Sequence, residues 1–143
     1  MAFASDLPRN RIKALLEKGV NVVCDRYYHS GMVYSAAKGK PDLDLNWAHA
    51  SDVGLPKPDI VVFLDLTPDE ARRRGGWGDE KYEKEEMQRK VRELFTSLAE
   101  SDEELVVVDA GGSITQVADK IWELVNEQVV TVAKENSPVG TVK

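Results

Sequence analysis

The sequence contains little cysteine and no long apolar run, and both absences narrow what the protein can be. Its 143 residues include one cysteine, Cys24. An internal disulfide is therefore impossible, and a reducing compartment is the simpler expectation. No apolar run approaches the roughly 20 residues that span a bilayer, and Met1–Arg9 lacks the apolar core of a secretory signal. We expect a cytosolic or nuclear protein without a membrane partner.

The sequence also lacks an excess of positive charge. It has 19 lysines and arginines against 25 acidic residues, a net charge of −6. A nucleic-acid partner is not expected, because binding a phosphate backbone needs a broad basic face. A small phosphate ligand remains compatible with this charge, since Arg72–Arg74 concentrate positive charge locally. Hydrophobic content of 42% and charged content of 31% are typical of a globular domain.

Apolar strand-like runs alternate with helical patterns along the chain. The runs are Val20–Cys24, Ile60–Leu66 and Leu105–Asp109. Strands separated by helices predict an α/β fold with a parallel sheet, although three strands are few for a sheet whose two faces both need cover. We expect one domain over residues 1–132 and a frayed tail over 133–143.

Two capping boxes mark the starts of helices. In Thr67–Glu70 a threonine is followed by proline and, three residues on, by glutamate, and Ser113–Gln116 repeats the pattern with glutamine. Between them a longer helix is predicted from about Asp79, with Val91 and Phe95 on its inner face.

Three segments carry the chemistry that the sequence suggests. Asp25–Ser30 follows the first apolar run, and the carboxyl ends of strands are where open α/β sheets bind ligands. Gly54–Asp59 leads into the second run. Arg72–Glu83 is a basic, glycine-bearing stretch that could close as a lid over phosphates. Phosphoryl transfer needs positioning and charge neutralisation, so the pattern indicates nucleotide chemistry.

These segments together resemble the thymidylate kinase family, and its eukaryotic members in particular. The resemblance rests on Asp25-Arg26-Tyr27 followed by Ser30, on Gly54–Asp59, and on the lid behind them. It runs from about Phe3 to Glu127 and matches the later two thirds of the family. It implies a three-layer P-loop kinase-like fold, with helices on both faces of a parallel sheet. It also implies transfer of the γ-phosphate of ATP to dTMP with Mg²⁺, in dTTP synthesis, by a homodimer.

The glycine-rich phosphate-binding loop of that family is absent from these residues. Such a loop presents backbone N–H groups and a lysine to the donor phosphates. The nearest string, Gly39-Lys40-Pro41, lacks the earlier glycine and the following hydroxyl, so we interpret it as a turn. The fold is therefore expected to be incomplete, without its first strand, P-loop and second strand. We expect these residues alone to be inactive or weakly active.

The resemblance also implies roles for individual residues. Asp25 would orient Mg²⁺ through its water shell, and Arg26 would hold the acceptor phosphate. Arg74 and Lys81 match lid positions, where bases pair with the donor phosphates or stack on adenine. Nearer the acceptor nucleotide, the matching residues are Phe3 against thymine, Ser30 and Tyr34 by the sugar, and Tyr82. The loop beside the donor adenine would be Ala110, Gly111 and Gly112.

Plainer interpretations stand beside these roles. An Asp-Arg pair can be a strand-end salt bridge, Tyr82 a core residue, and the two glycines an ordinary turn. Arg72 and Arg73 are interpreted as solvated helix charges, and His29 and His49 as structural residues, because they lack metal-ligand spacing. In family members the matching phenylalanine is soon followed by an arginine that reads the base, but Ser5–Pro8 follows Phe3 here.

Three alternatives for the whole chain remain. It could be a non-catalytic interaction module that pairs with a full-length thymidylate kinase. It could be the product of a truncated gene model. It could also be a kinase of another monophosphate or of a deoxynucleoside, but the latter enzymes typically carry Glu-Arg-Ser where this chain has Asp25-Arg26-Tyr27.

Overall fold

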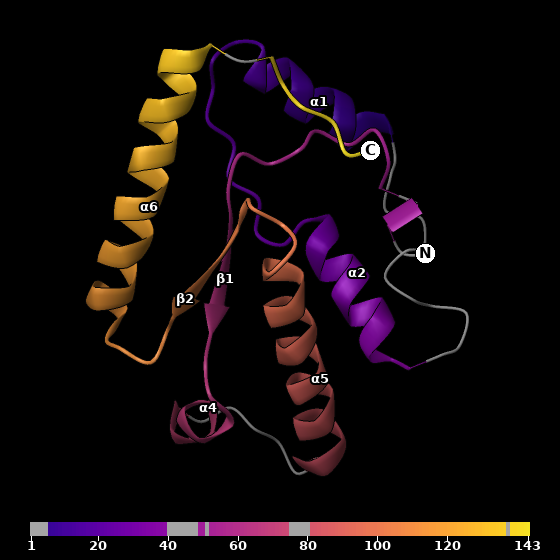
Figure 1. Ribbon diagram of the computed structural model, residues 1–143, viewed down its shortest axis with the longest axis vertical. Coiled ribbons are helices and arrows are strands. Elements are labelled where there is room, and N and C mark those ends of the chain that lie inside the picture. Colours follow the sequence, from indigo (N-terminus) through magenta and orange to yellow (C-terminus); the bar gives the residue numbers. More distant parts are fainter. Residues whose placement is uncertain (1–5, 40–48, 51, 75–80, 137) are drawn as a thin grey trace. The chain divides into compact units, whose positions relative to one another are not determined.

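The computed structural model describes residues 6–39, 49–50, 52–74, 81–136 and 138–143, with the side chains of 6–8 and 81–84 outside the description (Figure 1). They belong to two compact units. The first comprises residues 1–58 and 137–143, and the second comprises residues 59–136. No composition change or linker in the sequence marks the division between residues 58 and 59.

The second unit is built on two parallel strands, β1 (Val61–Asp65) and β2 (Leu105–Asp109). They pair in register from Val61 opposite Leu105 to Asp65 opposite Asp109. Both strands are rich in β-branched residues, which suit a pleated and partly buried surface. The predicted second and third strands are thus confirmed. The second strand is shorter than predicted by one residue at each end.

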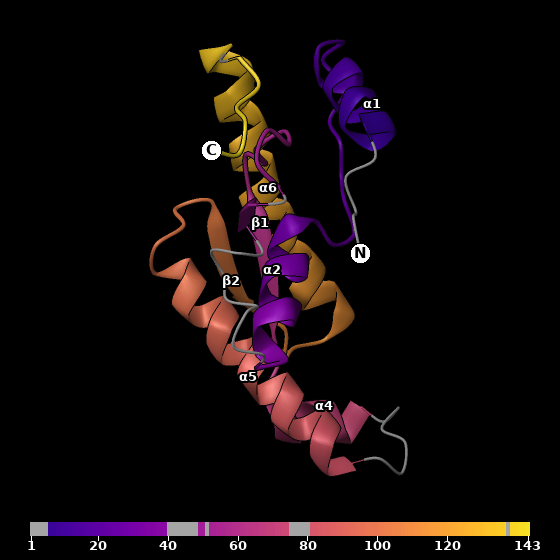
Figure 2. The same cartoon turned by 90° about the vertical axis from the view of Figure 1, so that its right-hand side faces the viewer.

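Three helices accompany these strands: α4 (Pro68–Arg74), α5 (Lys81–Ala99) and α6 (Ile114–Glu135). Helices α5 and α6 lie on opposite sides of the strands in Figure 1, and Figure 2 gives the view turned by 90°. Both long helices contact β2. Parallel strands with helices on both faces are the predicted α/β architecture, and this prediction is confirmed.

Both predicted capping boxes are present. The Glu70 backbone N–H donates to the Thr67 hydroxyl, and the Thr67 N–H donates to the Glu70 carboxylate, each over 3.3 Å. At the start of α6, Ser113 and Gln116 form the same reciprocal pair. Each box satisfies backbone donors that the first turn of a helix leaves without a partner.

The core of the second unit lies between α5 and the strands. Phe63 of β1 and Phe95 of α5 stack with their ring centroids 4.3 Å apart and their planes 12° apart. Val91, Phe95 and Leu105 are buried around this contact. The inner face predicted for the helix is therefore the one that packs.

The first unit contains α1 (Asp6–Leu16) and α2 (Tyr28–Ala37). The strand predicted over Val20–Cys24 is wrong: the segment is extended but makes no ladder, and Val23 is 93% exposed. A strand exists only where a neighbour accepts and donates its backbone hydrogen bonds, and nothing in the described ranges does so here. Helix α2 begins at Tyr28, within the Asp25–Ser30 segment.

The chain's last residues are paired with the first unit. Helix α6 continues to Glu135 and ends at Asn136 in a left-handed conformation (φ 48°). Farther on, Thr141 forms an antiparallel bridge with Pro56, and Val142 is only 5% exposed. This backbone pairing, within the tail predicted over residues 133–143, is a feature that the sequence did not indicate.

Candidate functional site

One group of predicted residues gathers where β1 and β2 end. Asp65 and Asp109 are the paired last residues of the two strands, and the Ala110 N–H donates to the Asp65 carbonyl over 2.8 Å. The strand pairing thus continues one residue into the loop Ala110–Gly112, which the resemblance assigns to the donor adenine. This loop lies at the carboxyl end of the sheet, the edge at which α/β proteins bind ligands.

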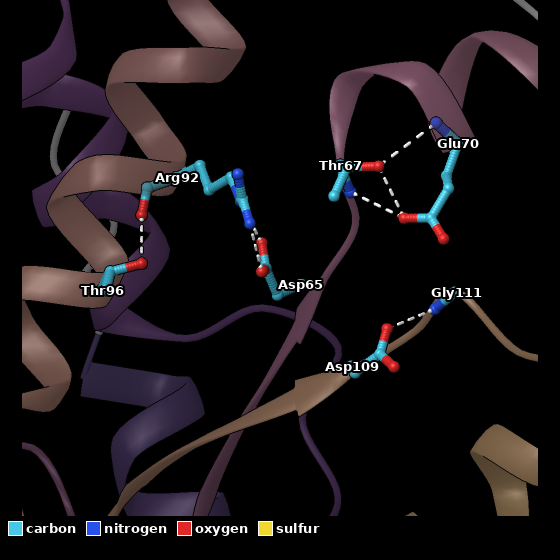
Figure 3. A network of polar contacts seen from close by, with 7 residues as sticks. All are labelled: Asp65, Thr67, Glu70, Arg92, Thr96, Asp109 and Gly111. Carbon is cyan, nitrogen blue, oxygen red and sulfur yellow. Dashed lines mark hydrogen bonds and ion pairs between the residues drawn. The ribbon is translucent and has the colours of Figure 1, made fainter.

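The loop is shaped by a turn at Gly111 that the Asp109 side chain closes. The Gly111 N–H donates to the Asp109 carboxylate over 2.8 Å (Figure 3). A Cβ at Gly111 would collide with the carboxylate oxygen Oε1 of Glu70 and would lie 3.1 Å from Asp109 Oδ1. A larger residue at this position would therefore require the Glu70 side chain to move away from the β2–α6 loop.

Arg74 joins α4 to that loop. Its guanidinium donates to the carbonyl oxygens of Ala110 and, over 3.0 Å, of Gly112. These partners are 36 and 38 residues away in sequence. The resemblance assigns both Arg74 and the Ala110–Gly112 loop to the donor side, and the structure brings them into direct contact.

A shallow hollow of about 190 Å³ opens beside this contact. Its lining residues are Glu70, Arg73, Arg74 and Gly111. A planar guanidinium next to exposed backbone offers a stacking surface and hydrogen-bonding groups, which an aromatic base or a phosphate can use. Arg73 meets the hollow, whereas Arg72 is held by Asp69 and Glu85 at 3.0 and 3.1 Å. Both residues are exposed, as predicted for solvated helix charges.

Asp65 and Arg92 form an ion pair that the sequence did not reveal. The Arg92 guanidinium donates two hydrogen bonds to the Asp65 carboxylate, over 2.6 and 2.8 Å (Figure 3). This pair fixes α5 to the end of β1. The hydrogen bond from Arg92 is the main cause that lowers the pKa of Asp65, against a smaller opposing effect of burial. An aspartate that ends a strand was the available signal, but its partner lies 27 residues away.

This ion pair should contribute a pH-dependent part of stability. Because the folded-state pKa of Asp65 is lowered, its contribution is present above the ordinary aspartate pKa of about 4 and is lost as pH falls through the folded value. We expect Arg92→Met to reduce the free energy of unfolding by about 1 kcal/mol at pH 7, a figure kept low because Arg92 is 41% exposed. The difference from wild type should shrink in acid. Urea unfolding at several pH values measures both effects.

A matched control lies one turn away on α5. Arg89 pairs with Glu93 over 3.3 Å, and both side chains are 62% exposed. Arg89→Met makes the same chemical change at a solvated pair, so its cost should be close to zero at every pH. Equal costs for the two substitutions would show that Arg92 contributes only its aliphatic stem.

Arg26, Ser30 and Tyr34, all predicted near the acceptor nucleotide, belong to the first unit, whereas Tyr82 belongs to the second. Asp25 and Arg26 form a bend just before α2, and Arg26 adopts a left-handed backbone conformation (φ 65°). The Arg26 guanidinium carbon lies 5.6 Å from the centroid of the Tyr34 ring, a cation–π contact. Ser30 and Tyr34 are four residues apart on α2 and therefore share a face. We refer to Asp25 and Arg26 as the acceptor-side turn.

Tyr27 follows this turn and anchors it. Its hydroxyl donates to the Pro56 carbonyl over 3.0 Å. Burial is the largest cause that raises the pKa of Tyr27, followed by the acidic groups of Cys24 and Asp52. The phenol therefore remains protonated, and a hydrogen-bond donor, throughout the physiological range.

Several predicted residues cannot be placed. Phe3 and the lid glycines Gly75, Gly76 and Gly78 lie outside the described residues. Lys81 and Tyr82 belong to the first turn of α5, but their side chains lie outside the description. His29 is buried and stacks on Tyr28, in agreement with a structural role.

The described residues contain no group of three or more histidine, cysteine or acidic side chains that could hold a metal ion. Within the same residues, no helix is long and apolar enough to cross a membrane.

The parallel strands, the flanking helices and the charged groups at the strand ends define a class, the α/β proteins that bind ligands at the carboxyl edge of the sheet. Comparison with known proteins narrows this class. The family model described as "Thymidylate kinase" matches residues 2–121. The chain belongs to the thymidylate kinase family.

Individual relatives agree with this assignment. The chain is 42% identical over 130 residues to the thymidylate kinase of Danio rerio, which covers 90% of this chain and 59% of the relative. It is 38% identical over 130 residues to the Homo sapiens thymidylate kinase, with the same coverage. A solved thymidylate kinase from Candida albicans superposes with a TM-score of 0.77 at 30% identity, covering 94% of this chain and 67% of that one. The chain spans about half the length of the curated relatives it matches.

Proposed function

We propose that this chain is the acceptor-binding and lid-bearing part of a thymidylate kinase, a phosphotransferase that converts ATP and dTMP to ADP and dTDP for dTTP synthesis. The observation that carries the proposal is the contact of Arg74 with the Ala110–Gly112 loop. Two segments that the resemblance assigns to the donor nucleotide meet there, beside an open hollow. The relatives named thymidylate kinase support an enzyme of this kind, and the single cysteine favours a reducing compartment such as the cytosol or nucleus.

The residues divide the work between the two nucleotides. On the donor side, Arg74 and Lys81 neutralise phosphate charge or stack on adenine, and Ala110, Gly111 and Gly112 border the base. On the acceptor side, Arg26 grips the dTMP phosphate, while Ser30 and Tyr34 lie by the sugar, with Tyr82 nearby and Phe3 against thymine. Charge neutralisation and positioning are what phosphoryl transfer requires of a protein.

Asp25 suits the Mg²⁺ that accompanies ATP. Its carboxylate is exposed, and nothing in the described part of the chain pairs with it. A single carboxylate fits Mg²⁺, which keeps several waters and takes its other ligands from phosphates. The bound ion would supply neutralisation of charge on the transferring phosphoryl group. Asp25 itself would orient the ion through a water.

These 143 residues contain no glycine-rich donor loop of their own, so we propose that they transfer phosphate weakly or not at all by themselves. One preorganised hydrogen-bond donor can be worth about 3 kcal/mol in catalysis. Turnover in a coupled ADP-release assay with ATP, Mg²⁺ and dTMP should be roughly a hundredth or less of that of a complete relative. A rate equal to the complete relative's would overturn this part of the proposal.

A second candidate is an interaction module that pairs with a full-length thymidylate kinase or forms a homodimer. The observation that favours it is apolar exposure on α6, where Ile114 is 91% and Trp122 is 67% exposed. Exposed apolar patches of this kind often mark interfaces. Size-exclusion chromatography of the chain alone and mixed with a complete relative separates the possibilities, because a module should shift to a mixed complex.

A further inference from the structure

Residues Gly140–Val142, here called the C-terminal strap, form a short antiparallel pairing with Gly54–Lys57. The Gly54 N–H donates to the Val142 carbonyl over 2.8 Å, and the Val142 N–H donates to Leu55 over 2.9 Å. The Lys57 N–H donates to Gly140 over 2.9 Å. Three backbone hydrogen bonds in so short a pairing are a specific attachment.

Side-chain burial adds to this attachment. Val142 is 5% exposed although it is the penultimate residue of the chain, and Pro56 in the opposing segment is also buried. Chain ends are usually poorly ordered unless something ties them down. Here the ties are backbone pairing and one buried valine.

The segment Gly54–Lys57 is held from its other side as well. Gly54 has φ +83°, a conformation that suits glycine. A Cβ at Gly54 would lie 3.3 Å from the Arg9 guanidinium, and Arg9 donates to the Val53 carbonyl over 3.0 Å. The segment is thus a turn fixed between α1 and the C-terminal strap.

The segment Gly54–Lys57 also contacts the residue that follows the acceptor-side turn. The Pro56 carbonyl accepts the Tyr27 hydroxyl, and Thr141 bridges to the same Pro56. Tyr27 directly follows Arg26, whose left-handed backbone needs support from its surroundings. The contacts therefore run without a gap from the end of the chain to the residue beside Arg26.

We propose that the C-terminal strap is a positioning element for acceptor binding, acting through Pro56 and Tyr27 on the acceptor-side turn. This inference rests on the proposed function, because it takes Arg26 as the group that grips the dTMP phosphate. Val142 lies beyond residue 121, where the family match ends. In this role the strap acts through Pro56 and Tyr27 and not by its own contact with a nucleotide.

The test uses the full chain with Val142→Asp, which places a charge at a buried site and releases the strap. The matched control is Val139→Asp, the same change in the same tail at a residue that is already 37% exposed. Calorimetry should show dTMP affinity weakened roughly fivefold to tenfold by Val142→Asp. Affinity for a non-hydrolysable ATP analogue should stay unchanged, and Val139→Asp should change neither. Equal weakening of both ligands would mean a merely structural role and would overturn the proposal.

Two further variants secure the result if Val142→Asp folds poorly. Val142→Ile should retain wild-type dTMP affinity. Tyr27→Phe breaks the chain of contacts between the strap and Arg26, because it removes the hydroxyl that donates to the Pro56 carbonyl. The effect of Tyr27→Phe on dTMP affinity should equal that of Val142→Asp. The double variant should bind dTMP little more weakly than either single variant. Fully additive effects would show that the strap does not act through Tyr27.

Amide hydrogen exchange separates this inference from the proposed function. In wild type the amides of Gly54, Lys57 and Val142 should be protected, because each donates a backbone hydrogen bond. Releasing the strap should also raise exchange at the Ser30 amide, which donates to the Tyr27 carbonyl over 3.1 Å. Unchanged exchange at Ser30 would refute the strap, whether or not the chain binds dTMP. Absence of dTMP binding with the exchange coupling intact would refute only the acceptor assignment.

Discussion

Replacing Arg26 with alanine is expected to weaken dTMP binding by roughly tenfold to a hundredfold. Hydrogen bonds that involve an ion are worth about 1.5–3 kcal/mol, and each 1.4 kcal/mol is a factor of ten in affinity. A guanidinium is suited to phosphate because its planar fork can donate two parallel hydrogen bonds. Calorimetric titration with dTMP measures the loss directly, and affinity for an ATP analogue should be unaffected.

Arg11→Ala is the matched control for this change. Arg11 is exposed on α1 and has no proposed contact with the nucleotide. The substitution removes the same charge from the same unit as Arg26→Ala does. It should alter dTMP affinity less than about twofold at physiological ionic strength, where distant exposed charges are screened. A loss as large as that of Arg26→Ala would reduce the role of Arg26 to general electrostatic attraction.

Replacing Phe95 with alanine is expected to lower the free energy of unfolding of the second unit by about 3 kcal/mol. Removal of a buried aromatic side chain loses its transfer free energy and leaves a cavity. Phe95 is 7% exposed and stacks on Phe63. Its removal therefore leaves a buried cavity and an unpaired Phe63 ring. Urea unfolding followed by circular dichroism gives the value.

The control for Phe95 is an aromatic residue on the opposite long helix. Trp122 of α6 is 67% exposed, and Trp122→Ala should change stability by no more than about 0.5 kcal/mol. If both substitutions cost the same, α5 does not form the core of this unit. If Trp122→Ala costs more, the exposed face of α6 is covered in solution, as the interaction-module alternative requires.

The elements of the second unit could be predicted because their signals are local. An apolar run bounded by turn residues predicted β2 at its observed limits, and the two capping boxes marked the starts of α4 and α6. Spacing of apolar residues also identified the inner face of α5. These features depend on residues a few positions apart, which a single sequence displays.

The prediction failed for Val20–Cys24 because a strand depends on a partner. Its apolar, β-branched composition fits a strand, but Val23 is 93% exposed and the described residues supply no ladder. Long-range contacts were invisible for the same reason. Nothing local links Asp65 to Arg92, or Pro56 to Thr141, because 27 and 85 residues separate these pairs.

For the site, the residue types could be predicted but their grouping could not. Resemblance assigned Arg74 and the Ala110–Gly112 loop to the donor side, and the structure places them in contact. Arg26 and Tyr34 likewise meet on the acceptor side. Glu70 was predicted only as a capping residue, yet it also lines the hollow beside Gly111. The roles of all these residues stay predictions until ligands are bound.

The most direct test of the central claim is to map where the two nucleotides bind by nuclear magnetic resonance on the isotope-labelled chain. Addition of dTMP should shift the backbone resonances of Asp25, Arg26 and Ser30. A non-hydrolysable ATP analogue with Mg²⁺ should shift the backbone resonances of Arg74 and Gly111. Each ligand should leave the resonances that the other ligand shifts largely unchanged. Saturating dTMP that leaves Asp25 and Arg26 unmoved would contradict the account.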